Sequence, residues 1–163
     1  MLNGSVADDD EHLRRAIELA ARARANGNHP FGSILVDPEG AVVLEAENTV
    51  VTSHDYTAHA ELNLVREAGS TFDPAVLRGC TLYTSTEPCA MCAGAIFWSG
   101  IGRVVFSLSS ATLGTIVSDE TGDWTLAMSC RDVFARGGRA VDVSGPLLES
   151  EGRVVHDGFW PGS

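Results

Sequence analysis

Apolar positions recur along the chain at two spacings, which alternate from segment to segment. Residues 9–25 carry a helical stripe that includes Leu13, Ile17 and Leu19. Acids open this segment and arginines close it, as the helix dipole prefers. Residues 32–36 and 41–47 have strand character and are joined by the turn sequence Asp-Pro-Glu-Gly. The beginning of the chain is therefore predicted to be a frayed tail (residues 1 to about 8), a helix and a β-hairpin.

The middle of the chain alternates between loop, helix and strand patterns. Residues 48–57 are predicted as a loop, 59–68 as a helix ended by Gly69, and 71–79 as a connector with a short helical piece after Pro74. A strand over 80–85 and a helix over 89–99 follow. Pro88 stands just before the first turn of that helix, a position that suits proline. Residues 103–107 form the next predicted strand.

The C-terminal third has a weaker pattern. Residues 109–128 are mixed polar and are predicted as a long loop with a helical turn. A helix over 131–136, a strand over 139–143 and a closing helix over 147–156 complete the chain. A helix between the last two strands predicts that they pair in parallel, because an antiparallel pair needs only a tight turn. The order α-β-β-α-β-α-β-α-β-α predicts a three-layer α/β architecture.

Length and composition fit one compact domain over residues 1–163. Hydrophobic residues make up 44% and charged residues 20% of the chain, as in ordinary globular proteins. No apolar run approaches the roughly 18 residues that span a bilayer. The N-terminus lacks the basic and apolar blocks of a secretory signal, so a cytoplasmic location is expected. Four cysteines in such a chain favour metal binding over disulfides.

The charge balance bears on the class of partner. The formal net charge is −11, lysine is absent and the arginines are scattered. Affinity for a phosphate backbone comes mostly from lysine and arginine. A nucleic-acid partner is therefore not expected, and a small neutral heterocycle fits better.

Two short motifs carry candidate metal chemistry. The first is His59-Ala60-Glu61, and the second is Pro88-Cys89-Ala90-Met91-Cys92. One imidazole and two thiolates provide three zinc ligands, and a catalytic zinc site keeps its fourth position for water. Glu61, two residues after the histidine, is placed to move protons on and off that water. The joint pattern matches zinc deaminases.

The predicted elements bring these residues together. His59 and Glu61 lie at the start of one helix, where both can reach a site beyond the helix end. Cys89 and Cys92 open the next helix at positions i and i+3, so both sulfurs can face one metal. Helix dipoles at these two N-termini favour the thiolate form.

Other interpretations of the cysteines remain open. A lone Cys-x-x-Cys also occurs in redox pairs and in structural zinc sites. A four-cysteine cage would need Cys80 and Cys130 to converge on the same point. These two are expected to be small buried apolar residues instead.

At these motifs the chain resembles the cytidine deaminase superfamily, within the branch of guanine deaminases, other nucleobase deaminases and tRNA adenosine deaminases. The resemblance extends from Asn28-His29-Pro30-Phe31-Gly32 to Ser107 and is most specific in residues 84–96. It implies the three-layer α/β/α cytidine deaminase-like fold, with a five-stranded mixed sheet flanked by helices, and a homodimer. It also implies Zn²⁺ held by His59, Cys89 and Cys92, with Glu61 as the catalytic proton shuttle.

The resemblance carries over further residues one at a time. Asn48, eleven before His59, matches an asparagine that hydrogen-bonds the base, and Phe31 matches an aromatic that lines the pocket; the alternatives are a turn-making asparagine and a core phenylalanine. Ala60, between the metal histidine and Glu61, is also expected to contact substrate. Trp98 matches an aromatic position of the guanine branch, although packing explains it equally well.

The C-terminal part departs from the guanine deaminase pattern after Ser109. Family members there end on an aromatic that closes the pocket; Phe159 and Trp160 are candidates for that role, and the alternative is that they only pack. An acidic residue that recognises the base is expected within residues 119–123, or at Glu149 or Glu151.

Three functions compete at this stage. The first is a zinc-dependent hydrolase that deaminates a small nucleobase or nucleoside, such as a guanine-like purine, a cytosine-like pyrimidine or a triazine analogue. The second is a tRNA adenosine deaminase, although the tail sequence Glu149-Ser150-Glu151 is acidic where those enzymes usually carry basic residues. The third is a zinc-stabilised binding module without activity.

Overall fold

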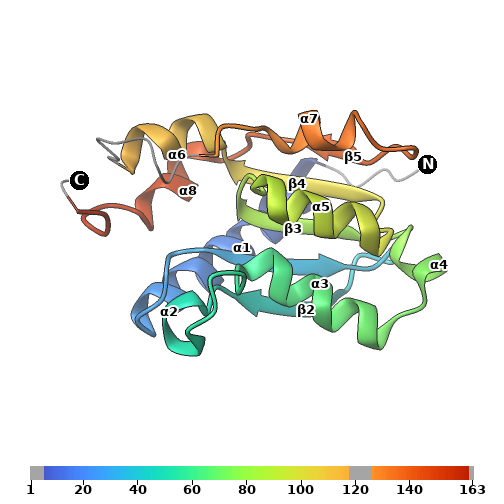
Figure 1. Ribbon diagram of the computed structural model, residues 1–163, viewed down its shortest axis with the longest axis horizontal. Helices are drawn as coiled ribbons and strands as arrows, with labels where there is room; N and C mark the ends of the chain where they lie inside the picture. Colours follow the sequence, from blue (N-terminus) through green and yellow to red (C-terminus); the bar gives the residue numbers. More distant parts are fainter. Residues whose placement is uncertain (1–5, 118–125, 162–163) are drawn as a thin grey trace.

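The computed structural model describes residues 6–117 and 126–161, and a five-stranded mixed sheet lies at its centre (Figure 1). The strands are β1 (Gly32–Val36), β2 (Val42–Glu47), β3 (Thr81–Thr86), β4 (Arg103–Leu108) and β5 (Asp142–Ser144), in the spatial order β2-β1-β3-β4-β5. β1 is antiparallel to β2 and β3, whereas β4 is parallel to β3 and β5. This confirms the predicted mixed sheet and the parallel pairing of the last two strands.

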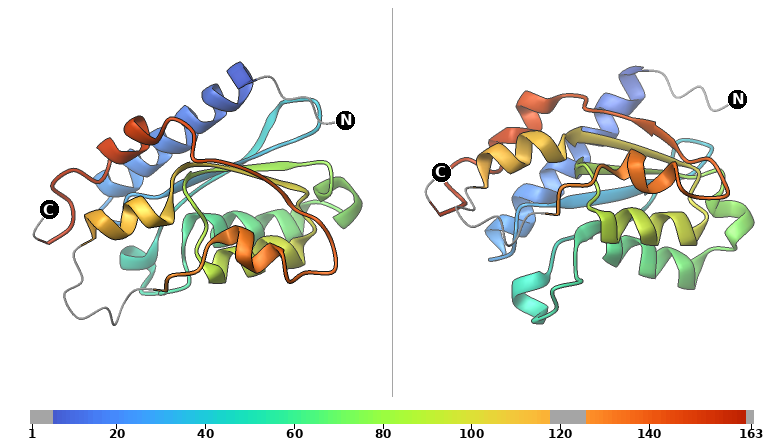
Figure 2. Two further views of the ribbon diagram at one scale, coloured as in Figure 1. Left: turned by 90° about the horizontal axis from the view of Figure 1, so that it is seen from above. Right: turned by 45° about the horizontal axis from the view of Figure 1, so that its top comes forward.

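Helices cover both faces of the sheet, as Figure 2 shows in its view from above. One face packs against α3 (Ala60–Thr71), α4 (Pro74–Leu77), α5 (Ala90–Ser99) and α7 (Cys130–Phe134). The other packs against α1 (Val6–Ala25) and α8 (Glu149–Val154). The short helices α2 (Val50–Ser53) and α6 (Ser110–Ile116) follow β2 and β4. No helix in the described ranges has the length and apolar character needed to cross a membrane.

The two central strands explain why the sheet is covered on both sides. All residues of β3 and β4 are buried. Leu82, Val104 and Phe106 belong to the core beneath α3 and α5. Tyr83 and Val105, which alternate with them, belong to the core beneath α1. Continuous burial of this kind is typical of strands covered by helices on both faces.

Two predictions in the middle of the chain were wrong. Gly69 does not end the second long helix: α3 runs on to Thr71, and a Cβ at Gly69 would meet nothing. The segment 48–57 is not entirely loop, because it contains α2. The backbone N–H groups of Val51 and Thr52 donate to Asn28 Oδ1, so a distant side chain stabilises a helical turn that the local pattern does not show.

The C-terminal elements differ from prediction mainly in their boundaries. β5 begins at Asp142 rather than at residue 139. The guanidinium of Arg139 instead donates to the carbonyl oxygens of Phe97 and Ile101 at the end of α5. The predicted helical turn after residue 109 is α6, and residues 118–125 of the predicted loop lie outside the described ranges. At the other end, α1 begins at Val6, earlier than predicted.

One edge of the sheet collects the chain segments that bear the motifs. β2 ends at Glu47 opposite Gly32, where β1 begins, and β3 ends next to the end of β4. α3 and α5 both start at this edge, on the left of Figure 1, where α2, α6 and the C-terminal segment also lie.

Candidate metal centre and catalytic site

His59, Cys89 and Cys92 come together at the starts of α3 and α5. His59 is the N-cap residue of α3 and Cys89 the N-cap residue of α5, and both have extended backbone angles. His59 Nδ1 lies 3.7 Å from Cys89 Sγ and 3.6 Å from Cys92 Sγ. The three potential ligand atoms all lie within 4.8 Å of one another. The structure therefore brings together the three predicted metal ligands.

The spacing of these atoms fits a tetrahedral zinc site. Zinc binds imidazole nitrogen at about 2.0–2.1 Å and thiolate sulfur at about 2.3 Å, so a tetrahedral angle places the nitrogen about 3.6 Å from each sulfur. The observed separations of 3.7 and 3.6 Å agree with this value. Cys80 and Cys130 do not join the cluster. They are buried free thiols, as predicted. Within residues 6–117 and 126–161 the donor set thus has three ligands, as in a catalytic site.

The two thiols of the cluster ionise differently. The pKa of Cys89 is lowered to about 4, chiefly because the Cys92 thiol hydrogen-bonds its sulfur and also because His59 lies beside it. The same bond to Cys89, together with burial, raises the pKa of Cys92. The cysteine pair therefore holds one thiolate and one shared proton, which a metal ion would displace.

Glu61 lies next to this cluster and is buried. Its Oε2 is 3.8 Å from Cys92 Sγ, and its Oε1 accepts a hydrogen bond of 3.0 Å from the Thr84 hydroxyl. Burial is the main cause that raises the pKa of the Glu61 carboxyl. A raised pKa brings the group closer to neutral pH, where it can both accept and release a proton. Thr84, on β3, fixes the carboxylate orientation and was not singled out from the sequence.

The predicted substrate residues lie around the same edge. The backbone N–H of Asn48 donates to the carbonyl oxygen of Phe31, which ties the end of β2 to the start of β1. Asn48 Oδ1 accepts from the N–H of Val50, whereas its buried Nδ2 has no protein partner among the described residues. Ala60, fully buried, occupies the first position of α3, where a backbone N–H has no intrahelical acceptor. Unused donors of this kind are available to a ligand.

The C-terminal segment lies against the start of β1. The Trp160 indole N–H donates to Nδ1 of His156, at 3.1 Å. The ring of Phe31 is 5.4 Å from that of His156 and 6.2 Å from that of Trp160, measured between centroids. Trp160 is therefore adjacent to the predicted pocket aromatic, and its sequence-based assignment remains a proposal.

The other sequence expectations have contacts or exposure outside the His59, Cys89 and Cys92 cluster. Trp98 is 85% exposed on α5, so packing does not explain it. Glu149 accepts from the backbone N–H and hydroxyl of Ser109, and Glu151 pairs with Arg14. Both candidate acids therefore have structural partners. The third expected location, residues 119–123, lies outside the described ranges.

Sequence reasoning also missed Glu87, a buried acid just before Pro88. Its Oε2 accepts from the backbone N–H and hydroxyl of Ser110, both at 2.9 Å, and its Oε1 accepts from the N–H of Cys130 at 3.1 Å. These bonds join the starts of α6 and α7 to the segment that leads into Cys89. An acid next to the cysteine motif was the available signal.

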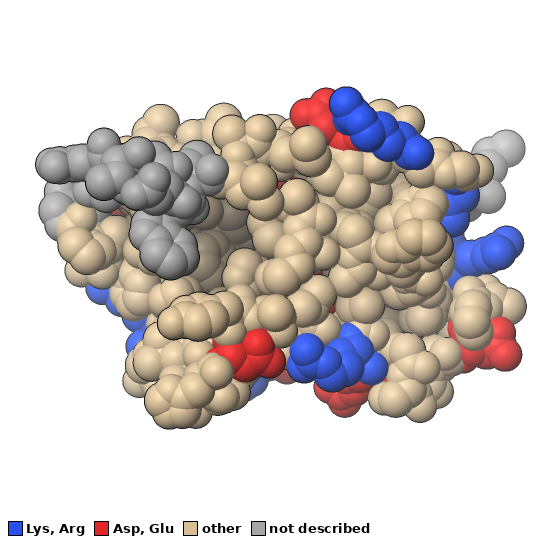
Figure 3. Space-filling model, in the orientation of Figure 1, with Lys and Arg blue, Asp and Glu red and all other residues tan. Residues whose placement is uncertain are grey.

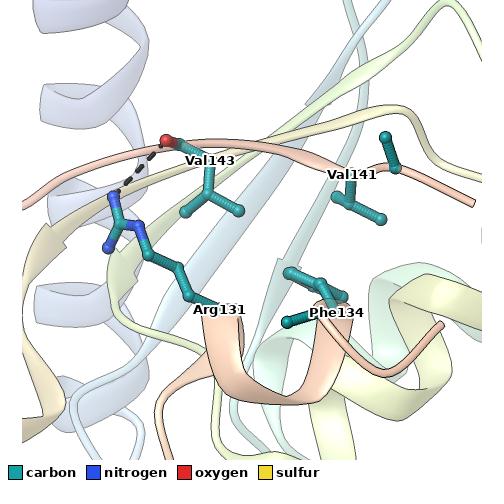
Figure 4. A pocket seen from close by; sticks show the side chains of 6 residues that line it. Arg131, Phe134, Val141 and Val143 are labelled. Carbon is teal, nitrogen blue, oxygen red and sulfur yellow. Dashed lines mark hydrogen bonds between the residues drawn. The ribbon is translucent and has the colours of Figure 1, made fainter.

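A separate concavity between α7 and β5 does not extend this site. It is lined by Phe134, Ala135, Ala140, Val141, Val143 and the side chain of Arg131 (Figure 4). The guanidinium of Arg131 donates to the carbonyl oxygens of Val143 and Gly145. The remaining lining is apolar, so this concavity offers no catalytic group.

The fold has three layers, with helices on both faces of one mixed sheet, and a His-Cys-Cys cluster and a buried carboxylate lie at one edge of that sheet. This combination defines a zinc-dependent hydrolase of the deaminase type. The profile of the cytidine and deoxycytidylate deaminase zinc-binding region matches residues 6–108. The chain therefore belongs to the cytidine deaminase family, and its cofactor is zinc.

Individual relatives agree with this assignment. A probable cytosine deaminase of Schizosaccharomyces pombe is 43% identical over 154 residues, which span 94% of this chain and 93% of the relative. A tRNA-specific adenosine deaminase of Haemophilus influenzae is 41% identical over 110 residues, or 68% of this chain and 64% of that enzyme. The structure of guanine deaminase from Nitrosomonas europaea has a TM-score of 0.73 at 26% identity, covering 89% of this chain and 80% of that one. The predicted superfamily and fold are thus confirmed.

Proposed function

We propose that the protein is a hydrolytic deaminase of a free nucleobase, with cytosine as the first substrate to test. The observation that carries the proposal is the carboxylate of Glu61, buried and 3.8 Å from Cys92 Sγ at the three-ligand cluster. A structural zinc site does not require a carboxylate that is not a ligand beside the three ligand residues. The combination fits a reaction in which water attacks a ring carbon and ammonia leaves.

In the proposed mechanism, His59, Cys89 and Cys92 would hold zinc, which when bound would supply a water activated for attack near neutral pH. Glu61 takes a proton from the attacking water while oxygen bonds to the amino-bearing ring carbon. It delivers that proton to the adjacent ring nitrogen, then takes the second proton from the new hydroxyl as the carbonyl forms, and passes it to the departing amine. The carbon–nitrogen bond then breaks and ammonia leaves. The hydroxyl of Thr84 holds Glu61 Oε1, so Oε2 is the oxygen left to exchange protons.

Asn48 and Ala60 are proposed to hold the base. The unpaired Nδ2 of Asn48 can donate to a carbonyl oxygen of the heterocycle. The backbone N–H of Ala60 offers a second donor at the start of α3. The rings of Phe31 and Trp160 are proposed as apolar walls that exclude water from the reacting carbon.

The choice of cytosine rests on the extent of the similarity. The S. pombe relative matches 94% of the chain, a larger share than the H. influenzae tRNA-specific adenosine deaminase matches. Guanine remains a substrate candidate because of the structural likeness to a guanine deaminase.

The decisive experiment measures ammonia release by zinc-loaded protein. Guanine, guanosine, cytosine, cytidine, adenine and their aza-analogues form the substrate panel. We expect turnover of cytosine, with no comparable turnover of the nucleosides. Release of ammonia from none of these compounds would refute the proposal.

A tRNA adenosine deaminase is the second candidate, because of the H. influenzae relative. The net charge of −11 and the absence of lysine disfavour binding to the phosphate backbone of tRNA. On the face shown in Figure 3, basic side chains form small groups, some directly beside acidic ones, without a continuous basic strip. Formation of inosine in tRNA incubated with the enzyme would reverse this ranking.

We further propose a cytoplasmic homodimer. Four free cysteines suit a reducing compartment. Trp98 and Met91 are exposed on α5, and large exposed apolar side chains are typical of interfaces. Light scattering coupled to gel filtration tests this proposal: we expect twice the mass of the 17.2 kDa chain, and a monomer after Trp98→Glu.

A further inference from the structure

His29 lies in the loop between α1 and β1, and surrounding contacts fix its position. Asn28, just before it, is buried, and its Oδ1 accepts hydrogen bonds from the backbone N–H groups of Val51 and Thr52. Pro30, just after it, restricts the backbone. The N–H of Phe31 donates to the carbonyl oxygen of His29, closing a tight turn. The imidazole is therefore carried by a rigid part of the site edge.

The ring of His29 faces the aromatic C-terminal segment. Its centroid is 5.5 Å from that of Trp160, in a tilted arrangement, and 6.0 Å from that of Phe159, edge to face. Trp160 is itself fixed by its hydrogen bond to His156. The ring is half-buried, and no hydrogen bond joins either of its nitrogens to another described residue.

The surroundings of the imidazole favour its neutral form. Burial lowers the pKa of His29, and the neighbouring charge of His59 lowers it further. The ring is therefore neutral near pH 7 and offers one N–H donor and one bare nitrogen acceptor. Such a pair can recognise a carbonyl oxygen, a ring nitrogen or an N–H group of a planar heterocycle.

Two other unpaired nitrogens lie around Phe31. The Nδ2 of Asn48 and the Nε2 of His156 are buried and have no partner among the described residues. The indole N–H of Trp160 is a donor, so His156 Nδ1 is the acceptor and the proton of the neutral ring is on Nε2. Buried polar groups are normally paired, so unpaired groups that gather at one edge point to a polar ligand.

We propose that His29 hydrogen-bonds the heterocyclic base and is a specificity-determining residue of this site. The proposal rests on the proposed nucleobase deamination. It adds a contact outside the His-x-Glu and Cys-x-x-Cys motifs, directed at a carbonyl oxygen or ring nitrogen of the substrate. The rings of Phe159 and Trp160 pack against the imidazole and position it, and the imidazole forms the proposed hydrogen bond with the base.

A role in packing alone makes the opposite prediction. If His29 only fills space against Trp160, a phenylalanine of similar shape keeps the ring contacts and the activity. If it recognises substrate, phenylalanine removes the hydrogen bond while keeping the packing. A glutamine, which again offers a donor and an acceptor, then restores part of the activity.

The test compares His29→Phe, His29→Gln and the control His54→Asn. His54 is exposed, has a left-handed backbone conformation that asparagine tolerates, and has no side-chain hydrogen bond or ring contact among the described residues. Zinc content and thermal unfolding verify that each variant is loaded and folded. Steady-state kinetics use the base that the wild type turns over, and calorimetry measures the Kd of the deaminated product.

For His29→Phe we expect kcat/KM to fall about tenfold or more, mainly through KM, and the product Kd to rise by a similar factor. His29→Gln should recover part of this loss, and His54→Asn should stay within about twofold of the wild type. Unchanged kinetics and product binding in His29→Phe would overturn the role of His29 while leaving the deaminase proposal intact. A wild type that deaminates no base would overturn both.

Discussion

At the scale of single residues, the site depends on the partner that orients the carboxylate of Glu61. Glu61 lies beside a cysteine sulfur that is a candidate metal ligand, yet its nearest fixed partner is the hydroxyl of Thr84. A neutral hydroxyl orients the carboxylate without neutralising it. An arginine or lysine in the same place would lower its pKa and weaken it as a proton carrier.

Replacing that carboxylate should separate chemistry from metal binding. In Glu61→Gln the amide keeps the shape and the bond from Thr84 but cannot carry a proton. We expect kcat to fall by at least about 100-fold, a typical contribution of general acid–base catalysis, with zinc content unchanged. Ammonia release and metal analysis measure the two quantities. Full activity in Glu61→Gln would show that another group moves the proton.

His156 gives the protein a measurable response to acid. Burial is the main cause that lowers its pKa to about 4, from the ordinary histidine value of 6.5. The unfolded chain therefore binds more protons than the folded chain between these two values. The contribution of His156 to stability is complete above pH 6.5 and is lost as the pH falls through about 4.

The expected loss is on the order of 2 kcal/mol of unfolding free energy. Carboxylates also titrate in this range, so His156→Gln provides the comparison, because its amide oxygen can still accept the Trp160 N–H. Urea unfolding at pH 7 and pH 4 should show a smaller drop for His156→Gln than for the wild type. Equal drops in the two proteins would contradict the neutral, buried state of His156.

At the scale of elements, a buried ion pair fastens α1 to the sheet. Asp9 accepts two hydrogen bonds from the Arg103 guanidinium, at 2.8 and 2.9 Å, and one from the Tyr83 hydroxyl at 2.7 Å. Burial alone would raise the pKa of Asp9, but the bonds from Arg103 and Tyr83 outweigh it, so the pKa is lowered. α1, β3 and β4 therefore meet at one charge-assisted network.

Breaking this network should cost far more than breaking a surface pair. Asp9→Asn leaves the buried Arg103 with only the longer pair to the exposed Asp142, at 3.6 Å, and we expect a loss of about 3 kcal/mol in unfolding free energy. The exposed pair between Arg14 and Glu151 also joins α1 to another element, so Glu151→Gln is the matched control, with an expected loss below about 1 kcal/mol. Urea midpoints at pH 7 measure both. Equal effects would mean that burial of the Asp9 pair does not matter.

The elements also show what the sequence could and could not predict. The strand cores and the ligands His59, Cys89 and Cys92 follow from local patterns, since each motif lies within a few residues of a helix start. The partners Thr84, Glu87 and His156 depend on contacts between distant segments, such as the 23 residues between Thr84 and Glu61. α2 was missed for the same reason, because it is stabilised by Asn28, which is distant in the sequence although it contacts α2 directly.

At the scale of the whole molecule, the question is how much of the fold depends on the metal. The ligands come from two helices that already pack on a continuous core, which includes Leu64 of α3, Ile96 of α5 and Val104 of β4. Small zinc-dependent folds lack such a core and unfold without metal. In this protein the metal joins two helix starts that the core already positions.

Zinc removal should therefore lower stability without unfolding the chain. A ligand present at a free concentration of about 1,000 times its Kd adds about 4 kcal/mol to the free energy of unfolding. This corresponds to a rise of roughly 8–16 °C in Tm for a chain of this size. We expect chelation to lower Tm by about this amount while far-ultraviolet circular dichroism at 25 °C stays unchanged, and added zinc to restore Tm. Cys89→Ser, which lacks one of the three ligand atoms, should show a much smaller response to the chelator. Loss of secondary structure at 25 °C in the chelated wild type would instead mean that zinc organises the fold itself.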